Sequence, residues 1–137
     1  IIGILAAVGV NTFGGFQDKA KINATKAIHK NTQKKIAAEV VKCSLGDSNI
    51  FSTAVTCAST PAGTASAIKT ALGSGNASLF SDKNSWSSTS ALAVKSGTTH
   101  ELGFTNLAVS GATITLKTCT KTACASADQL TDNILVE

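Results

Sequence analysis

The sequence predicts an α+β domain in which a long N-terminal amphipathic helix packs on a three- to four-stranded antiparallel sheet. Two patterns predict this class. Residues 16–45 repeat apolar side chains at spacings of three and four, as one face of a helix does. Residues 91–137 alternate apolar and polar side chains, as strands with one buried face do. A chain of 137 residues has room for one core, so we expect residues 16–137 to form a single globular domain.

Residues 1–15 form the predicted apolar N-terminal helix segment, which opens with the uncharged run IIGILAAVGV. As a helix this run spans only about 15 Å, half of a bilayer core, so it cannot cross a membrane alone. A soluble domain does not tolerate such an exposed apolar stretch. We therefore expect it to be the end of a longer apolar helix that is buried against copies of itself. The predicted assembly core comprises Ile1, Ile2, Ile4, Leu5, Val8, Val10 and Phe13.

Glycine makes residues 8–15 the predicted weak point of this helix. Adjacent Gly14 and Gly15 each cost about 1 kcal/mol relative to alanine in a helix interior. We therefore expect a kink or an unwound stretch there, which would let a filament lengthen without separating its subunits. The weak-point residues are Gly9, Asn11, Gly14 and Gly15.

A row of lysines runs along the amphipathic helix. Lys26, Lys30 and Lys34 are four residues apart, so they stack along one edge and repel one another. The first 42 residues carry seven lysines against two acids, a net charge of +5, whereas the remainder carries five against six, a net charge of −1. We expect acids of a neighbouring subunit to face this row, although a solvated helix face explains it equally well. The first candidates are Asp128, Asp132 and Glu137.

Residues 46–90 are rich in Gly, Ser, Thr, Ala and Asn, and we expect a connecting loop with one short helix. That helix is predicted at Thr64–Leu72, where Thr64 can cap its start and Gly73 follows its end. The large apolar side chains of the polar stretch that follows are expected in the core rather than against a neighbouring subunit. They are Leu79, Phe80 and Trp86.

From residue 90 onward, apolar side chains recur at every second position and mark strands separated by turn residues. The marking pairs are Leu92 with Val94, Leu102 with Phe104, and Ile114 with Leu116, and a last run covers Asn133–Glu137. The apolar face of such a sheet needs a cover, which the apolar stripe of the long helix can supply. We expect this stripe to comprise Phe16, Ala20, Ala24, Ala27, Ile28, Ala37, Val40 and Val41.

The four cysteines lack the C-x-x-C spacing of a zinc ribbon or a redox motif. An even number of cysteines in a chain rich in Ser and Thr favours disulfides in an oxidising compartment. Of the three possible pairings we favour the local one, in which each bridge contributes about 2 to 3 kcal/mol. It joins Cys43 to Cys57 and Cys119 to Cys124. A bridge from the helix to a strand stays open as the alternative.

No residue pattern predicts catalysis, a cofactor or a metal ion, and we do not expect an enzyme. Neither His29 nor His100 has a Cys or a carboxylate at a spacing that imposes a triad or a metal site, so both are expected to be surface imidazoles. Asp82 and Asn84 fit a plain turn better than a cation loop. The twelve basic residues are all lysine, which disfavours sequence-specific DNA reading because the bidentate Arg contact to guanine is missing.

The opening IIGILAA at Ile1–Ala7, followed by a long amphipathic helix and a disulfide-bearing C-terminal domain, resembles type IV pilins of the Gram-negative kind. In that family the mature chain starts with a methylated Phe, has a Glu four residues later and continues through an apolar run ending in this motif. The resemblance therefore implies that the Phe and the Glu lie upstream of Ile1. Over residues 1 to about 45 the resemblance is one of sequence motif. Downstream of these residues only the order of the structural elements is similar. The family often has a Pro after the motif, where this chain has three glycines in Val8–Gly15.

The resemblance implies a pilin-like fold and the role of major structural subunit of an extracellular type IV pilus. Such a subunit lies in the inner membrane until the pilus assembly machinery adds it to a helical homopolymer, which serves adhesion, motility or uptake. Disulfides and Ser/Thr-rich loops favour this long-lived surface filament over a pseudopilin of type II secretion, the first alternative. The second alternative is a DNA-binding competence pilin, which the lysine row suggests. Lysines buried inside a filament, however, cannot meet DNA.

Overall fold

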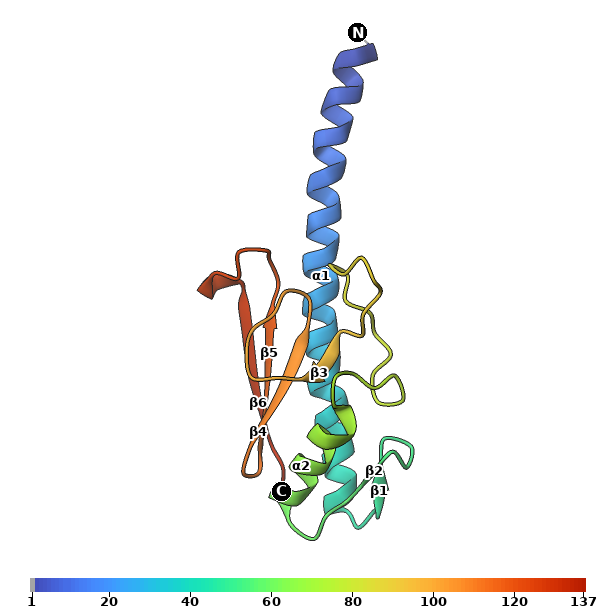
Figure 1. Cartoon of the computed structure of the whole chain (residues 1–137), viewed down its shortest axis with the longest axis vertical. Helices are drawn as coiled ribbons and strands as arrows, with labels where there is room; N and C mark the ends of the chain where they lie inside the picture. Colours follow the sequence, from blue (N-terminus) through green and yellow to red (C-terminus); the bar gives the residue numbers. More distant parts are fainter. Residues whose placement is uncertain (1) are drawn as a thin grey trace.

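A computed structural model describes residues 2–137 and, in the first helix, side chains from Gly15 onward. That helix, α1 (Ile2–Ser44), projects its N-terminal half from the domain that the rest of the chain forms (Figure 1). We call the end of the domain from which α1 projects the rod end, and the opposite end, where α1 finishes, the far end. The assembly core expected within residues 1–13 lies outside the described side chains.

α1 runs without interruption through its glycine-rich stretch, so the kink or unwound stretch expected there was wrong for the single subunit. The residues concerned are Gly9, Asn11, Gly14 and Gly15. Glycine lowers helix propensity but keeps its backbone N–H, and the helical hydrogen bonds can still form. Proline, which removes a donor, is the residue that breaks a helix. The glycines therefore reduce the stability of this stretch without changing its shape.

Four strands form the main sheet in the order β3 (Val94–Ser96), β4 (Thr105–Ser110), β5 (Thr113–Cys119) and β6 (Gln129–Leu135). β4, β5 and β6 are antiparallel neighbours, as expected, although β6 begins earlier than the predicted last run. β3 pairs in parallel with β4. The sheet is therefore mixed, and the expected fully antiparallel sheet was wrong.

The parallel pairing arises because the segment around Leu102 and Phe104, which the alternation of apolar and polar residues predicted to be a strand, does not form one. Leu102 makes only an isolated bridge with Cys119, and Phe104 lies just before β4. Between them, Gly103 adopts a left-handed backbone with a φ of 73°, and a Cβ there would lie 1.9 Å from the Asn84 side chain. The chain turns at this glycine instead of pairing along its length, and β4 then starts in the same direction as β3.

α2 (Pro61–Leu72) begins three residues before its predicted start. Thr60 caps it by accepting a hydrogen bond from a backbone N–H of the first turn, and the proline that follows fits a position where no N–H is needed. Thr64, the expected cap, is instead buried within the helix. Gly73 follows the end of α2 as predicted, with a φ of 50°.

The connecting segment also contains a small hairpin, β1 (Asn49–Ile50) with β2 (Val55–Thr56), where only loop was expected. Its turn has three consecutive non-glycine residues with positive φ: Phe51, Ser52 and Thr53. Such residues rarely adopt this backbone conformation, so no turn rule could place the hairpin from the sequence.

Both local disulfides are present, which confirms the favoured pairing. Cys43–Cys57 joins the end of α1 to the residue after β2, and Cys119–Cys124 closes the loop after β5. A short 3₁₀ turn, η1 (Ser126–Asp128), leads from that loop into β6.

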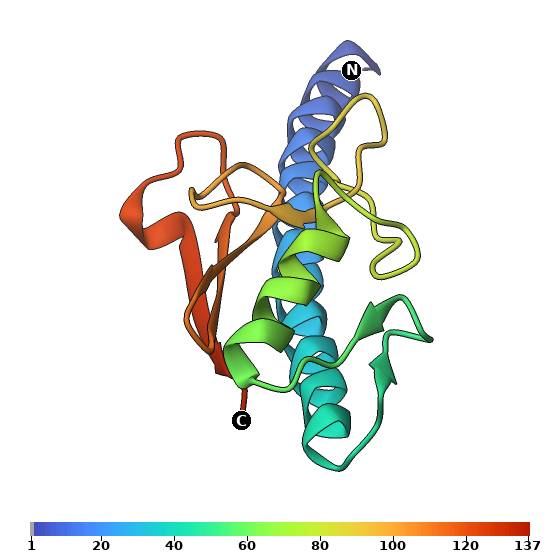
Figure 2. The ribbon, with the colours of Figure 1, turned by 60° about the horizontal axis from the view of Figure 1, so that its bottom comes forward.

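α1 and α2 pack against the sheet and enclose one core with it (Figure 2). α1 contacts β4, β5 and β6, whereas α2 contacts β3, β4 and β5. Leu79 and Phe80 are buried in this core, as predicted, and Trp86 is half-buried. The long connecting loop therefore contributes to the core.

The buried side of α1 has the predicted period but shares only Val40 with the predicted stripe, while Ile28 and Ala37 of that stripe are partly buried against the core. The buried side consists of Thr25, His29, Thr32, Ile36 and Val40. Phe16 and Val41, both assigned to the buried stripe, are 63% and 52% exposed. The prediction was wrong there because it took apolar character as the mark of burial, while three of the five buried positions are polar.

Candidate functional site

A polar seam joins α1 to the sheet at His29, which is only 2% exposed and is not the surface imidazole that we expected. Its Nδ1 lies 2.7 Å from Thr118 Oγ1 on β5, and its Nε2 donates to Asp132 Oδ2 on β6 at 2.8 Å. Thr118 in turn donates to Thr105 Oγ1 on β4 at 3.1 Å. One helical side chain thus links the helix to three strands through hydrogen bonds.

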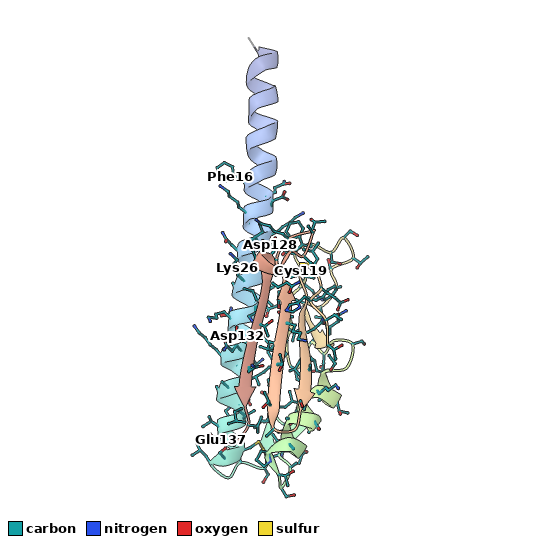
Figure 3. The ribbon with its side chains drawn as sticks, turned by 90° about the vertical axis from the view of Figure 1, so that its left-hand side faces the viewer. Phe16, Lys26, Cys119, Asp128, Asp132 and Glu137 are labelled. Atoms are coloured by element: carbon teal, nitrogen blue, oxygen red, sulfur yellow. A yellow bond between two sulfur atoms is a disulfide. The ribbon has the colours of Figure 1, made fainter. Side chains whose placement is uncertain are left out.

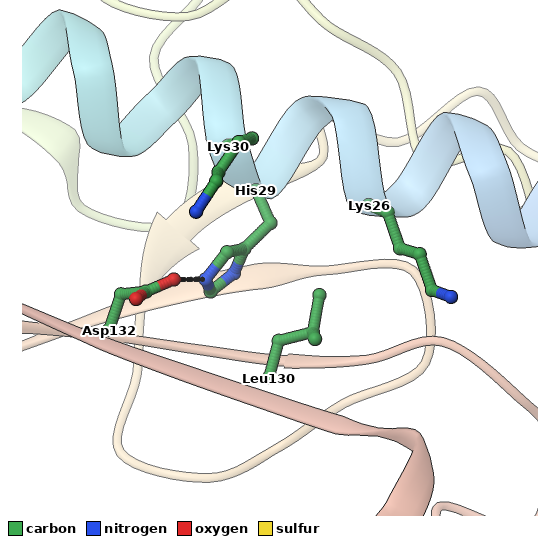
Figure 4. Close-up of a pocket in the computed structure, with 5 residues that line it drawn as sticks. All are labelled: Lys26, His29, Lys30, Leu130 and Asp132. Carbon is green, nitrogen blue, oxygen red and sulfur yellow. Dashed lines mark hydrogen bonds and ion pairs between the residues drawn. The ribbon is translucent and has the colours of Figure 1, made fainter.

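The basic pocket lies beside this seam, on the side of α1 that faces β6 (Figure 4). It is a hollow of about 200 Å³ lined by Lys26, His29, Lys30, Leu130 and Asp132. Lys26 and Lys30 are exposed, and neither forms an ion pair with any residue that the structure describes. The pocket therefore carries the two lysine ammonium groups and the Asp132 carboxylate around an apolar surface made by Leu130 and the imidazole ring, so lysines outnumber acids in its lining.

The acids expected to face the lysines of a neighbouring subunit divide into two groups. Asp132 accepts a hydrogen bond from His29, and Asp128 lies 3.6 Å from the Lys121 ammonium, so both acids have partners in their own chain. Glu137 lies at the far end, exposed, and its side chain forms no ion pair within the described residues (Figure 3). Among the described residues, Glu137 is therefore the candidate without a partner in its own chain, and contact with a neighbouring subunit stays a prediction for all three acids.

The outward side of α1 exposes apolar and small side chains along its whole described length. Phe16 stands on the projecting part, and Val41 and Leu45 lie at the far end, with Leu45 80% exposed (Figure 3). Between them this side carries Ala20, Ala27, Lys34 and Ala38, all exposed. Residues spaced by three, four or seven lie on one side of a helix, so these positions form a single unpartnered face. We call it the outer face of α1.

Glu39 fixes the far end of α1 to the β1–β2 hairpin. Its carboxylate accepts a hydrogen bond from the Phe51 N–H at 2.6 Å and one from the Lys42 ammonium at 2.7 Å. Burial acts to raise the pKa of Glu39, but these two hydrogen bonds outweigh burial, so its pKa lies below the ordinary value. The charged carboxylate therefore stabilises the folded state.

We expect acid to destabilise the domain in part through Glu39. A carboxyl whose pKa is lowered by folding contributes stability above its unfolded pKa, near 4.3, and loses it as the pH falls through the folded pKa. The urea midpoint of the wild-type domain should therefore drop more between about pH 5 and pH 3 than that of Glu39→Gln. Asp82→Asn, at an exposed acid with no ion pair among the described residues, serves as the control. Equal slopes for wild type and Glu39→Gln would contradict the assignment.

A second hollow, of about 360 Å³, lies beside α1 near Asp18 and Ile22 and is also lined by Trp86. The Lys21 ammonium lies 5.1 Å from the centre of the Trp86 ring, a distance at which the cation is attracted to the ring face. Trp86 therefore borders a surface hollow as well as the domain interior.

No protein-family model, curated protein or solved structure matches this chain. Among the described residues, no helix is long and apolar enough to cross a membrane, and no group of three His, Cys, Asp or Glu side chains gathers as a metal site would require. The features that bear on function are therefore the projecting helix, its outer face and the basic pocket.

Proposed function

We propose that this chain is the structural subunit of a type IV pilus, which assembles through the N-terminal helix into a helical homopolymer. The outer face of α1 is the observation that carries the proposal. One uninterrupted helix joins the apolar residues 2–10 to an exposed face that includes Phe16 and Val41, with Leu45 just past its end. A lone domain gains nothing by exposing Phe16 and Val41, whereas packing against copies of the same helix would bury these apolar side chains.

The rest of the architecture suits an extracellular filament. Two disulfides fix the end of α1 and the loop after β5, which fits an oxidising environment. Seen from the side, the sheet and the loops lie to one side of α1, so rods could bundle at the centre of a filament with the domains outside (Figure 3). Under this proposal the subunit waits in the inner membrane for the assembly machinery, and the finished pilus serves adhesion, motility or uptake.

Electron microscopy of the natural full-length protein, recovered from the surface of the cells that make it, tests the proposal. Long unbranched filaments of this one chain are the expected result. Only short filaments on overproduction would favour a pseudopilin of type II secretion instead. Filaments that retain double-stranded DNA at physiological salt would favour a competence pilin. Monomers under every condition would contradict assembly altogether.

A further inference from the structure

Two separate surfaces of the domain complement each other in charge and in apolar character. The first is the basic pocket, where Lys26 and Lys30 stand over Leu130 (Figure 4). The pocket lies where β6 has just begun, toward the rod end (Figure 3). Both lysines lack an ion-pair partner in the part of the chain that the structure describes.

The second surface lies at the far end, and we call it the acidic end. Leu45 and Leu135, the two most exposed large apolar side chains of the domain beyond the rod, are 80% and 61% exposed there. Asp47 and Glu137 flank them: the Asp47 N–H bonds the last turn of α1 at the Lys42 carbonyl, and the Ser44 hydroxyl donates to the Glu137 backbone carbonyl. Neither acid forms an ion pair with a described residue.

The two surfaces cannot meet within one copy. The basic pocket is built on residues 26–30 of α1, whereas the acidic end lies just beyond Ser44, where α1 finishes. From Lys30 to Ser44 the helix rises about 21 Å at 1.5 Å per residue. A second copy that is displaced along the helix direction can bring them together. A contact between two different patches of identical subunits repeats without closing and generates a filament.

We propose that the acidic end of one copy sits on the basic pocket of a neighbouring copy in the filament. Leu45 then covers the apolar surface at Leu130, and Asp47 and Glu137 face the ammonium groups of Lys26 and Lys30. Lys34, one turn further along α1, extends the same positive row toward the neighbour. This inference rests on the proposed function, and it names the surfaces that set the stagger between adjacent subunits.

Such a contact orders the subunits more than it holds them together. Ion pairs at a partly exposed rim contribute little individually and are screened by salt, whereas the apolar rods supply most of the cohesion. The contact recurs at every subunit, however, and it opposes staggers that bring lysine against lysine. Its loss should therefore reduce filament yield and regularity most at low ionic strength, where charges act over longer distances.

Zero-length cross-linking of wild-type filaments tests the contact directly. Filaments are grown from an equal mixture of nitrogen-14 and nitrogen-15 subunits and treated with a carbodiimide, which couples an ammonium to a carboxylate that touches it. We expect cross-linked peptides joining Lys26 or Lys30 to Asp47 or Glu137, with both isotopes present in one product. Filaments that yield no isotopically mixed product between these residues would overturn the inference while leaving the filament itself established.

Charge reversal supplies an independent test. Lys30→Glu should lower the yield of sedimentable filaments several-fold at low ionic strength, and Glu137→Lys in the same chain should partly restore it. The matched controls are Lys69→Glu and Asp82→Lys, at exposed positions without ion pairs among the described residues. Wild-type yield from Lys30→Glu would overturn the contact. If the wild-type protein never forms filaments, that result would instead contradict the proposed function itself.

Discussion

Replacing Leu5 by lysine is expected to abolish filaments while the domain folds as before. Leu5 lies in the part of α1 that projects from the domain, inside a run of ten residues without a polar side chain. If that run is buried among copies of itself, each added ammonium must lose its water without gaining a partner, which costs several kcal/mol per subunit. Every subunit of the polymer carries the same substitution, so every contact between subunits is weakened and no unaltered contact compensates for the loss.

The measurement pairs filament counts by electron microscopy with the thermal unfolding midpoint of the domain. Leu5→Ile, which keeps an apolar side chain of the same volume, is the matched control and should assemble normally. An unchanged unfolding midpoint in Leu5→Lys would show that assembly alone is lost. Filaments at wild-type yield from Leu5→Lys would mean that the apolar run is not buried in the polymer.

Truncating His29 to alanine is expected to cost about 2 to 4 kcal/mol of unfolding free energy. The imidazole is almost fully buried between α1 and the sheet, so its removal leaves a cavity. It also removes two hydrogen bonds, one to Thr118 and one to the carboxylate of Asp132. The Thr118 hydroxyl and the Asp132 carboxylate then lose a hydrogen-bond partner that the methyl group of alanine cannot replace.

Urea unfolding at neutral pH checks this expectation. Lys30→Ala, one residue away on the exposed side of the same helix, is the matched control and should change the unfolding free energy by less than about 0.5 kcal/mol. Asp132→Asn keeps a hydrogen-bond acceptor for His29 and should cost less than the truncation. A loss below about 1 kcal/mol for His29→Ala would show that the polar seam does not hold the helix to the sheet.

Local signals in the sequence predicted the elements that depend on neighbouring residues alone. The long helix follows from a run without proline, and the local disulfides follow from separations of 14 and 5 residues. The end of α2 follows from Gly73, whereas its start was misplaced because Thr64 was preferred to Thr60 with the proline after it. A Thr-Pro pair before an apolar repeat is a signal that could have corrected this.

The features that were missed depend on contacts between distant parts of the chain. His29 and Asp132 are 103 residues apart, and nothing local in either segment shows that a histidine will be buried and hydrogen-bonded. The parallel β3 depends on the fit of Gly103 against Asn84, another contact between separate segments. At the candidate site, the contact between subunits that the sequence suggested for the lysine row and the C-terminal acids stays a prediction. The sequence could not show that Asp132 has His29, 103 residues away, as a hydrogen-bond partner in its own chain.

The placement of β6 decides when this domain can finish folding during synthesis. β6 is the last of the described strands, and it lies against β5 and against α1, which precedes it by about 100 residues. Until β6 has been synthesised, α1 lacks Asp132 as the partner of His29, and the sheet lacks the edge strand beside β5. Contacts between such distant segments also slow folding, because a long loop must close before they form. A nascent chain therefore keeps this sheet and the α1 seam incomplete, and open to transport or proteolysis, until β6 has left the ribosome.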